Sequence, residues 1–333
     1  MEKALSIFKK KKNIGLGKIR ISKNQVMGGF FGFCVGDALG VPVEFLTREE
    51  LQENLVFSMK GYGTYNQPPG TWSDDSSLTF CLAESLCNGL NYKDIARRLY
   101  RWRYEGYYTP YGVAFGVGKT TANAIENIGK GKNPVECGGS EEGDNGNGSL
   151  MRVLPLAYFL VNTKDEEKFN IIHKVSSLTH GHPRSKIACS IYVQLAIELL
   201  RGESIREAYL RTQDKINEYY KDEEYEEELQ NFKRILKEDI SLYKKGEIQS
   251  TGYVIHTLEA SIWSLLNSIS YQETVLKAVN LGEDTDTTAA VAGGLAGIFY
   301  GIDSIPKIWV QKIVKKEEIM TLINRFSKAI AKR

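Results

Sequence analysis

The chain has 333 residues, of which 42% are hydrophobic and 25% are charged, and its formal net charge is +2. This composition is ordinary for a soluble globular protein of one or two domains, and the small net charge argues neither for nor against nucleic-acid binding by the whole chain. The five cysteines form no C-x-x-C pair. They therefore indicate neither a zinc site nor a disulfide framework, and a reducing cytoplasm is the expected location.

The chain opens with a basic lead over residues 1–24, which includes four consecutive lysines at residues 9–12. Such a run could bind nucleic acid or a membrane, but we expect a solvated, flexible segment and neither of these partners. The lead lacks the apolar core and cleavage site of a signal peptide. Residues 25–333 are expected to form one domain, and the longest small-apolar run, residues 289–302, is too short to span a bilayer.

From residue 26 the pattern predicts a helix with a glycine at every fourth position, namely Gly28, Gly32, Gly36 and Gly40. Glycines at this spacing share one face of a helix and allow another backbone to approach closely. Asp37 lies within the same helix, and we expect it to pair with a basic residue or a helix terminus. Glu44 follows the helix and is expected on a loop.

Two stretches far apart in sequence, residues 71–77 and 282–288, place carboxylates and hydroxyls before apolar helical runs. Taken alone, each is most simply a helix cap that satisfies free N–H groups. Each nevertheless carries more side-chain oxygens than a cap uses. If the two helix starts meet, their carboxylates repel one another unless cations are present. Oxygen ligands suit Mg²⁺, Ca²⁺ or Mn²⁺, so the sharper hypothesis is a two-metal site.

The rest of the chain also follows helical periodicity. We expect helices over residues 92–103, 118–128, 150–160, 166–178, 187–200, 251–266, 271–281 and 305–331. Strand-type alternation is nearly absent, so the predicted fold class is all-α, as a single compact multi-helix domain. An acidic run at residues 222–228 is expected to be a solvated helix face.

Two loops between these helices allow more than one interpretation. Residues 137–149 are rich in glycine and form either a plain surface loop, which the residues alone favour, or a backbone cradle for an anion. Residues 179–184 contain His180 and His182, which could bind zinc, although no third soft ligand lies nearby.

Five motifs occur in a specific order along the chain. They are Gly-Asp-Ala-Leu-Gly at residues 36–40 followed by Glu44, Trp-Ser-Asp-Asp at 72–75, Asn-Gly-Ser-Leu-Met-Arg at 147–152, Leu-Thr-His at 178–180 and Gly-Glu-Asp-Thr-Asp-Thr at 282–287. Over residues 26–300 the chain resembles the ADP-ribosylglycohydrolase family, which includes dinitrogenase reductase-activating glycohydrolases and ADP-ribosyl-acceptor hydrolases. The resemblance implies an all-helical enzyme with two Mg²⁺ or Mn²⁺ ions at its centre. It would remove ADP-ribose from an ADP-ribosylated protein or small molecule, at the anomeric carbon of the distal ribose.

Matching residue by residue, the resemblance also implies individual roles. The metal ligands would be Ser73, Asp74, Asp75, Asp284, Asp286 and Thr287. The catalytic residues would be Glu44, Asp75 and Asp286, with Glu44 on a mobile loop that approaches the scissile bond. The substrate-binding residues would be Asn147, Gly148, Ser149, Met151, His180, Tyr111 and Phe115. In this interpretation the glycine-rich loop is an anion cradle around the diphosphate.

The expected chemistry agrees with these roles. Cleaving a ribosyl bond creates an oxocarbenium-like centre. Metal ions can orient the ribose and lower the pKa of a bound water, and a carboxylate such as Glu44 or Asp75 can accept or deliver a proton.

One position departs from the family pattern. Enzymes of the dinitrogenase reductase-activating type read Phe-Asp-Ile-Gly after the aromatic link, whereas residues 115–118 here read Phe-Gly-Val-Gly. Gly116 therefore replaces a carboxylate that would face a guanidine leaving group. The departure leaves metal binding intact but calls arginine-linked substrates into question, so serine-linked ADP-ribose or a small metabolite stays open.

Two alternatives to this enzyme are retained. Helical prenyl-diphosphate enzymes also hold Mg²⁺ with acidic helices, but their Asp-Asp-x-x-Asp pattern would need an acid where Leu78 stands. The other alternative is an ADP-ribose-binding or scaffold protein that keeps the fold without turnover. Retention of all six expected metal ligands argues against a scaffold.

Overall fold

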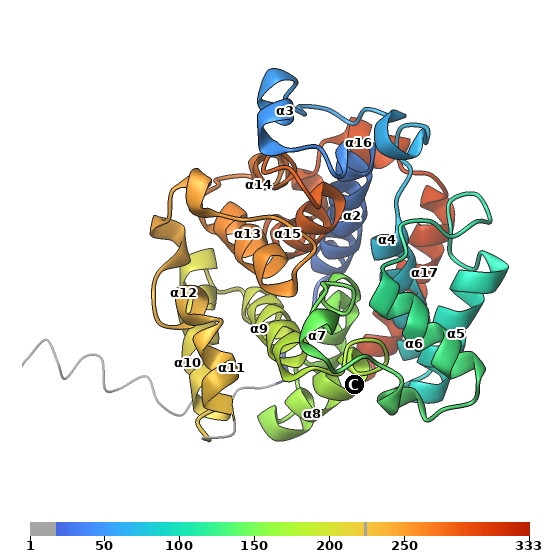
Figure 1. Ribbon diagram of the computed structural model, residues 1–333, viewed down its shortest axis with the longest axis vertical. Helices are drawn as coiled ribbons and strands as arrows, with labels where there is room; N and C mark the ends of the chain where they lie inside the picture. The colour runs from blue at the N-terminus through green and yellow to red at the C-terminus, as the bar shows by residue number, and fades with distance from the viewer. Residues whose placement is uncertain (1–17, 223–224) are drawn as a thin grey trace, which may run out of the picture.

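A computed structural model describes residues 18–222 and 225–333, which form an all-helical body (Figure 1). The first helices are α2 (Lys23–Gly40), α3 (Arg48–Glu53), α4 (Asp74–Leu86), α5 (Tyr92–Glu105), α6 (Lys119–Gly129), α7 (Leu154–Leu160), α8 (Asp165–Ser176) and α9 (Pro183–Leu200). The later helices are α10 (Ile205–Tyr219), α11 (Glu226–Gln230), α12 (Lys233–Leu236), α13 (Val254–Leu266), α14 (Tyr271–Val279), α15 (Thr285–Tyr300), α16 (Lys307–Lys312) and α17 (Lys316–Ile330). Within the described ranges, β-structure is limited to isolated bridges, which confirms the all-α prediction.

Helices α2 and α15 lie side by side at the centre of the molecule (Figure 1). A Cβ atom added at Gly28, Gly32 or Gly36 would come within 3.0 Å of backbone atoms of α15. Helix α15 contributes its own glycines to the contact, with Gly297 beside Gly28 and Gly293 beside Gly32. Because packed interiors leave no room for extra atoms, the two backbones can meet only through these glycines. The close approach predicted from the glycine spacing is confirmed.

The antiparallel pairing of these two helices brings the end of α2 to the start of α15. Thr285 Oγ1 donates a hydrogen bond to Gly40 O at 3.0 Å. A Cβ atom added at Gly40 would also come within 3.0 Å of the Asp286 backbone. Asp37 and Glu44 are therefore carried to the point where α15 begins.

The segment Lys23–Val43 is long and apolar enough to cross a membrane, judged by length and composition alone. In its most apolar window, however, 89% is buried inside the protein. Its packing against α15 accounts for the apolar surface, and α2 is therefore the core helix of this fold.

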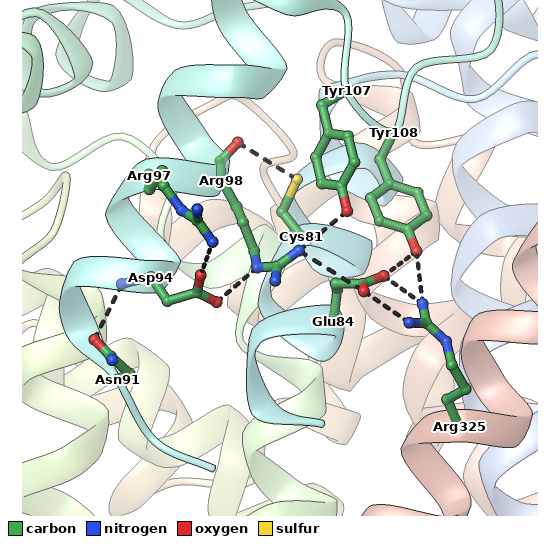
Figure 2. Close-up of polar contacts among 9 residues, drawn as sticks. All are labelled: Cys81, Glu84, Asn91, Asp94, Arg97, Arg98, Tyr107, Tyr108 and Arg325. Carbon is green, nitrogen blue, oxygen red and sulfur yellow. Dashed lines mark hydrogen bonds and ion pairs between the residues drawn. The ribbon is translucent and has the colours of Figure 1, made fainter. Parts of the chain in front are cut away.

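Helix α4 is anchored through its C-terminal half to three other segments (Figure 2). Glu84 accepts hydrogen bonds from Arg325 Nη1 of α17 at 2.9 Å and from the Tyr108 hydroxyl. Arg98 of α5 lies 3.8 Å from Glu84 Oε1 and donates to the Tyr107 hydroxyl at 3.0 Å. This network connects α4, α5 and α17 to the aromatic link at residues 106–112. Because residues 115–118 follow this link in the chain, the network helps to hold them beside the start of α4.

Some boundaries differ from those expected. The closing region at residues 305–331 is divided into α16 and α17, with Lys315 between them in the left-handed conformation at φ 56°. In residues 205–236 only the acidic run at 222–228 was predicted to be helical, whereas the structure contains α10, α11 and α12 there. The acidic run at residues 222–228 was predicted to face solvent. Glu228 differs from this prediction, because its side chain accepts a hydrogen bond from Arg184 Nε at 2.8 Å.

The expected basic lead is only partly described. The four lysines at residues 9–12 lie outside the described residues. The end of the lead is attached to the helical body, since Ile19 N donates to Asn162 Oδ1 at 2.9 Å and the Ser22 side chain caps α2.

Candidate active site

The two acidic helix starts meet, as the sequence suggested. Helix α4 begins at Asp74 and α15 begins at Thr285, with Asp284 as its N-cap residue. Thr287 Oγ1 donates a hydrogen bond to Asp75 Oδ1 at 3.3 Å, across 212 positions of the sequence. The positive ends of both helix dipoles are thus directed at one small acidic region.

Asp37 of α2 holds the start of α4 in place. Its carboxylate accepts from Ser73 N at 2.9 Å, from Ser76 N at 3.0 Å and from Ser76 Oγ at 2.6 Å. These bonds satisfy N–H groups that a helix start leaves free. The expectation that Asp37 pairs with a helix terminus is confirmed, and its role here is to position α4.

Five carboxylates form two groups that share Asp286. Oxygens of Glu44, Asp284 and Asp286 all lie within 4.8 Å of one another, and so do oxygens of Asp37, Asp75 and Asp286. Three carboxylate oxygens in these groups are buried without any hydrogen-bond partner: Glu44 Oε2, Asp75 Oδ2 and Asp284 Oδ1. Buried acceptors are normally satisfied, so these orphaned oxygens point to a missing partner.

The electrostatics of the groups indicate what that partner is. Burial, followed by the neighbouring carboxylates, raises the pKa values of Asp74, Asp75 and Asp286 well above their usual range. Burial and the charge of Asp284 raise the pKa of Glu44 to about 7. In the part of the chain that the structure describes, none of these acids forms a salt bridge. Divalent cations fit a donor set of this kind, because they are hard ions that take carboxylate oxygens.

A pocket of about 910 Å³ opens onto these acids. Among the residues with predicted roles, it is lined by Glu44, Asp74, Asp75, Asp284, Asp286, Thr287, Asn147, Gly148, Met151 and His180. Tyr65, Thr121, Asp144 and Gly252 also line the pocket and were not predicted. Tyr65 lies in the Gly- and Pro-rich loop before α4, where no periodic pattern could have marked it.

Four of the predicted residues lie beside the pocket and do not line it. Ser73 is buried, and its Oγ caps α4 by accepting from Asp75 N at 3.3 Å. Ser149 is buried, and its Oγ accepts from Cys189 Sγ at 3.4 Å. Phe115 packs against Tyr65 with ring centroids 5.1 Å apart. The Tyr111 hydroxyl lies 3.4 Å from Thr71 Oγ1.

The glycine-rich loop approaches the acids through Asn147. Its Nδ2 donates to Asp284 Oδ2 and to Thr257 Oγ1, both at 2.8 Å. The side chain of Asn147 therefore orients Asp284 and leaves Asp284 Oδ1 open. The next residues, Gly148 and Ser149, donate their backbone N–H groups to no backbone carbonyl among the described residues. Free amides of this kind favour the anion cradle over a plain surface loop.

His180 is held in the pocket wall as a neutral imidazole. Its Nδ1 lies 2.8 Å from Thr179 Oγ1. Burial, with a contribution from nearby Arg152, lowers the pKa of His180 to about 3. Arg152 is itself buried and donates to Gly148 O and to Val175 O, so it ties the glycine-rich loop to the end of α8.

His182 differs from His180 in that it caps a helix. Its Nδ1 accepts from Arg184 N at 3.2 Å and so caps α9. The acidic neighbours of His182, Glu142 and Glu228, are bridged by the Arg184 guanidinium. Ligand atoms of Glu142, His182 and Glu228 lie within 4.8 Å of one another, but the Arg184 guanidinium already pairs with both acids. His180 is not part of this group, so the structure does not support a zinc site shared by His180 and His182.

The fold and the site define a class: all-helical proteins with a carboxylate-lined pocket, built where two helix starts meet and suited to divalent cations. Comparison with known proteins places the chain within that class. The sequence model of the family described as ADP-ribosylglycohydrolase matches residues 20–333. The chain belongs to the ADP-ribosylglycohydrolase family and is a hydrolase.

The relatives cover most of the chain. It is 32% identical over 306 residues to an ADP-ribosylarginine hydrolase of Serratia proteamaculans, covering 90% of this chain and 78% of the relative. It is 30% identical over 301 residues to the ADP-ribosyl-[dinitrogen reductase] glycohydrolase of Rhodospirillum rubrum, covering 89% and 92%. A solved structure described as an ADP-ribosylglycohydrolase-related protein complex matches with a TM-score of 0.78 and 30% identity, over 92% of this chain and 98% of that chain. The resemblance predicted from five motifs is confirmed.

Proposed function

We propose that the chain hydrolyses the bond between the distal ribose of ADP-ribose and an acceptor, with the help of two Mg²⁺ or Mn²⁺ ions. The observation that carries this proposal is the set of buried, unpartnered oxygens on Glu44, Asp75 and Asp284 in one pocket. The relatives named as ADP-ribosyl hydrolases supply the substrate class.

The residues that would hold the ions come from both helix starts: Ser73, Asp74, Asp75, Asp284, Asp286 and Thr287. Bound cations of this kind orient ribose hydroxyls and lower the pKa of a water molecule. Asp37 is outside this set, because its oxygens are already used by Ser73 and Ser76. It acts by holding α4 where its acids face Asp286.

Glu44 is our candidate for moving the proton. It lines the pocket, and its Oε2 has no partner. A carboxyl group in this position, next to the expected ions and open to the pocket, can accept or deliver a proton, as a general acid–base group does. Asp286 and Asp75 contribute charge that stabilises an oxocarbenium-like centre.

The diphosphate would lie against the glycine-rich loop. The free N–H groups of Gly148 and Ser149 can donate to phosphate oxygens without a lysine. Neutral His180 in the same wall offers a hydrogen bond to a ribose or phosphate oxygen. Met151 supplies an apolar part of the wall.

For the acceptor we favour an arginine linkage, on two observations. The first is the Serratia relative, an ADP-ribosylarginine hydrolase. The second concerns Gly116, which lacks the carboxylate of the dinitrogenase reductase-activating type. A Cβ atom at Gly116 would lie 2.5 Å from Asp74 Oδ1, so the missing carboxylate would have stood directly beside the expected metal ligands. Gly116 leaves this space open to an acceptor group next to Asp74.

The test is a panel of purified substrates that carry ADP-ribose on arginine, on serine or on a nucleic-acid end. The products are identified by mass spectrometry in the presence of Mg²⁺ or Mn²⁺. The proposal predicts release of intact ADP-ribose, fastest from arginine. Release of pyrophosphate would favour a diphosphate enzyme, and tight ADP-ribose binding without release would favour a reader or scaffold.

A further inference from the structure

Phe45, at the mouth of the pocket, is both exposed and strained. It lines the pocket directly after Glu44, and 64% of its surface is exposed. Its φ angle is 69°, in the left-handed region that bulky residues rarely adopt. Such strain is retained at functional sites, where the surrounding structure enforces it.

The backbone around Phe45 enforces this conformation. Phe45 N donates to Glu283 O, and Glu283 N donates to Leu46 O, both at 2.7 Å. Glu283 is itself at a positive φ of 61°. Two residues with positive φ angles are thus connected by backbone hydrogen bonds, and these bonds hold the Phe45 ring at the surface. Glycine or asparagine would be less strained at this position, so stability alone does not explain a phenylalanine.

The ring of Phe45 is one end of a row of aromatic side chains. Its centroid lies 6.4 Å from that of Tyr65, and Tyr65 lies 5.1 Å from Phe115. We call Phe45, Tyr65 and Phe115 the aromatic row. Two residues before Phe115, Val113 is 71% exposed. Apolar groups gathered in this way at a pocket mouth mark a contact surface, unlike scattered exposed ones.

The aromatic row borders the acids where the acceptor would leave. Phe45 follows Glu44, and Phe115 precedes Gly116, which lies beside Asp74. The expected diphosphate loop has other neighbours, because Gly148 lies against Thr121 and His180. The position of the row therefore suits the acceptor side of the bond and not the ADP-ribose side.

The charge close to the row is mainly acidic, with Lys119 as an exposed basic residue that lines the same pocket. Residues 44–53 carry four glutamates and one arginine. That arginine, Arg48, is already bound to the backbone carbonyls of Leu281, Lys245 and Ile248. Glu49, Glu50 and Glu53 are exposed on or beside α3. Aromatic faces next to carboxylates are the surface on which guanidinium and ammonium groups bind best.

We propose that the aromatic row is the docking surface for the acceptor polypeptide, and that it prefers a basic segment around the modified residue. This inference rests on the proposed function, and it adds that the substrate is a protein and not a free metabolite. We infer a polypeptide as the binding partner because the aromatic row continues into the pocket. We infer a basic segment because the charge beside the row is mainly acidic.

The test compares three substrates: a short peptide ADP-ribosylated on one arginine between lysines, the same peptide with glutamates in place of the lysines, and free ADP-ribosyl-arginine. Phe45→Asn removes the ring and tolerates the left-handed backbone. We expect its kcat/KM for the basic peptide to fall about 10-fold relative to that for ADP-ribosyl-arginine, the scale of a lost cation–π contact at an interface. The wild-type protein should prefer the basic peptide, and that preference should weaken with salt.

The matched control is Phe57→Asn. Phe57 is 63% exposed, almost the same as Phe45, but it does not line the pocket. An equal loss in Phe57→Asn, or an unchanged substrate ratio in Phe45→Asn, would overturn the proposal. A matching loss of free ADP-ribose affinity in Phe45→Asn would also overturn it, because the ring would then stack on the nucleotide. If the wild-type protein releases ADP-ribose from none of the three substrates, the result contradicts the proposed function itself, and the docking surface falls with it.

Discussion

Glu44 is held in place by its backbone while one oxygen of its side chain stays without a partner. Thr64 Oγ1 donates to Glu44 O at 2.7 Å, and the next residue, Phe45, is tied to Glu283. The side chain is buried, and Oε2 has no hydrogen-bond partner. The mobile loop that the resemblance implies for Glu44 stays a prediction, and its movement would have to break these backbone hydrogen bonds.

Glu44→Gln separates chemistry from folding at this position. The amide keeps the shape of the side chain but cannot transfer the proton, so kcat should fall at least about 100-fold. Stability should be unchanged or higher in metal-free protein, because one charge is removed from a group of buried carboxylates. Thermal unfolding and steady-state kinetics measure the two effects. Normal turnover in Glu44→Gln would leave Glu44 as a structural acid.

His180 and His182 are predicted to differ in what they support. His180→Ala removes a neutral hydrogen-bond partner from the pocket wall, and ADP-ribose should bind about 10-fold more weakly, with metal content unchanged. His182→Ala removes the α9 cap and should cost about 1 kcal/mol of stability, with a smaller effect on ADP-ribose affinity. Calorimetric titration and metal analysis test both variants. Loss of zinc from either one, with affinity intact, would reverse the assignment.

At the scale of elements, the pairing of α2 with α15 determines the geometry of the site. Gly36 lies against the Ala289 backbone, one turn from Asp286. The same contact region places Asp37 beneath the start of α4 through its bonds to Ser73. A shift between α2 and α15 would therefore separate the acids that we propose hold the ions.

Gly36→Ala tests this pairing. The added Cβ would come within 3.0 Å of Ala289 backbone atoms, which cannot yield as a flexible side chain could. We predict a loss of about 1–3 kcal/mol in unfolding free energy, together with weaker metal binding. Gly246→Ala is the control, because no atom lies within 4 Å of a Cβ at Gly246. Similar urea midpoints for the two variants would contradict the account.

Local patterns predicted most of the helices and the two acidic helix starts, and the family resemblance supplied the other expected site residues, but neither predicted how distant segments meet. The spacing of Gly28, Gly32 and Gly36 predicted a close helix contact, yet nothing in it named α15 as the partner. The cap that Asp37 provides to Ser73 joins residues 36 positions apart, and no period encodes it. Tyr65 lies in an irregular loop, and its place in the pocket depends on tertiary contacts alone.

At the scale of the whole molecule, folding concentrates negative charge at the centre. The carboxylates of Glu44, Asp74, Asp75 and Asp286 are buried close together, and burial raises the pKa of each. Without cations, the folded protein therefore still holds protons at a pH where the unfolded chain, with ordinary carboxyl pKa values of 3.8 and 4.5, has already released them. Part of its stability is therefore linked to pH and to metal.

The sign of this linkage can be predicted from Glu44. Its pKa rises from 4.5 to about 7 on folding, so the stability contributed by the bound proton is complete below pH 4.5 and lost as pH rises through 7. In EDTA the unfolding temperature should fall between about pH 5 and about pH 8, and the gain on adding Mg²⁺ should grow over the same range. Asp286→Asn should weaken both the pH dependence of the unfolding temperature in EDTA and the pH dependence of the gain with Mg²⁺. A metal-free protein that becomes more stable as pH rises through this window would contradict the linkage.

The central claim is that cations held between α4 and α15 drive release of ADP-ribose. The most direct measurement is the rate of ADP-ribose release from an arginine-linked substrate, before EDTA treatment, after it, and during titration with Mg²⁺ or Mn²⁺. The account predicts loss of activity in EDTA, recovery on adding either metal, and little recovery in Asp286→Asn, which lacks the carboxylate shared by both acidic groups. Full turnover by the metal-free protein, or wild-type turnover by Asp286→Asn, would contradict it.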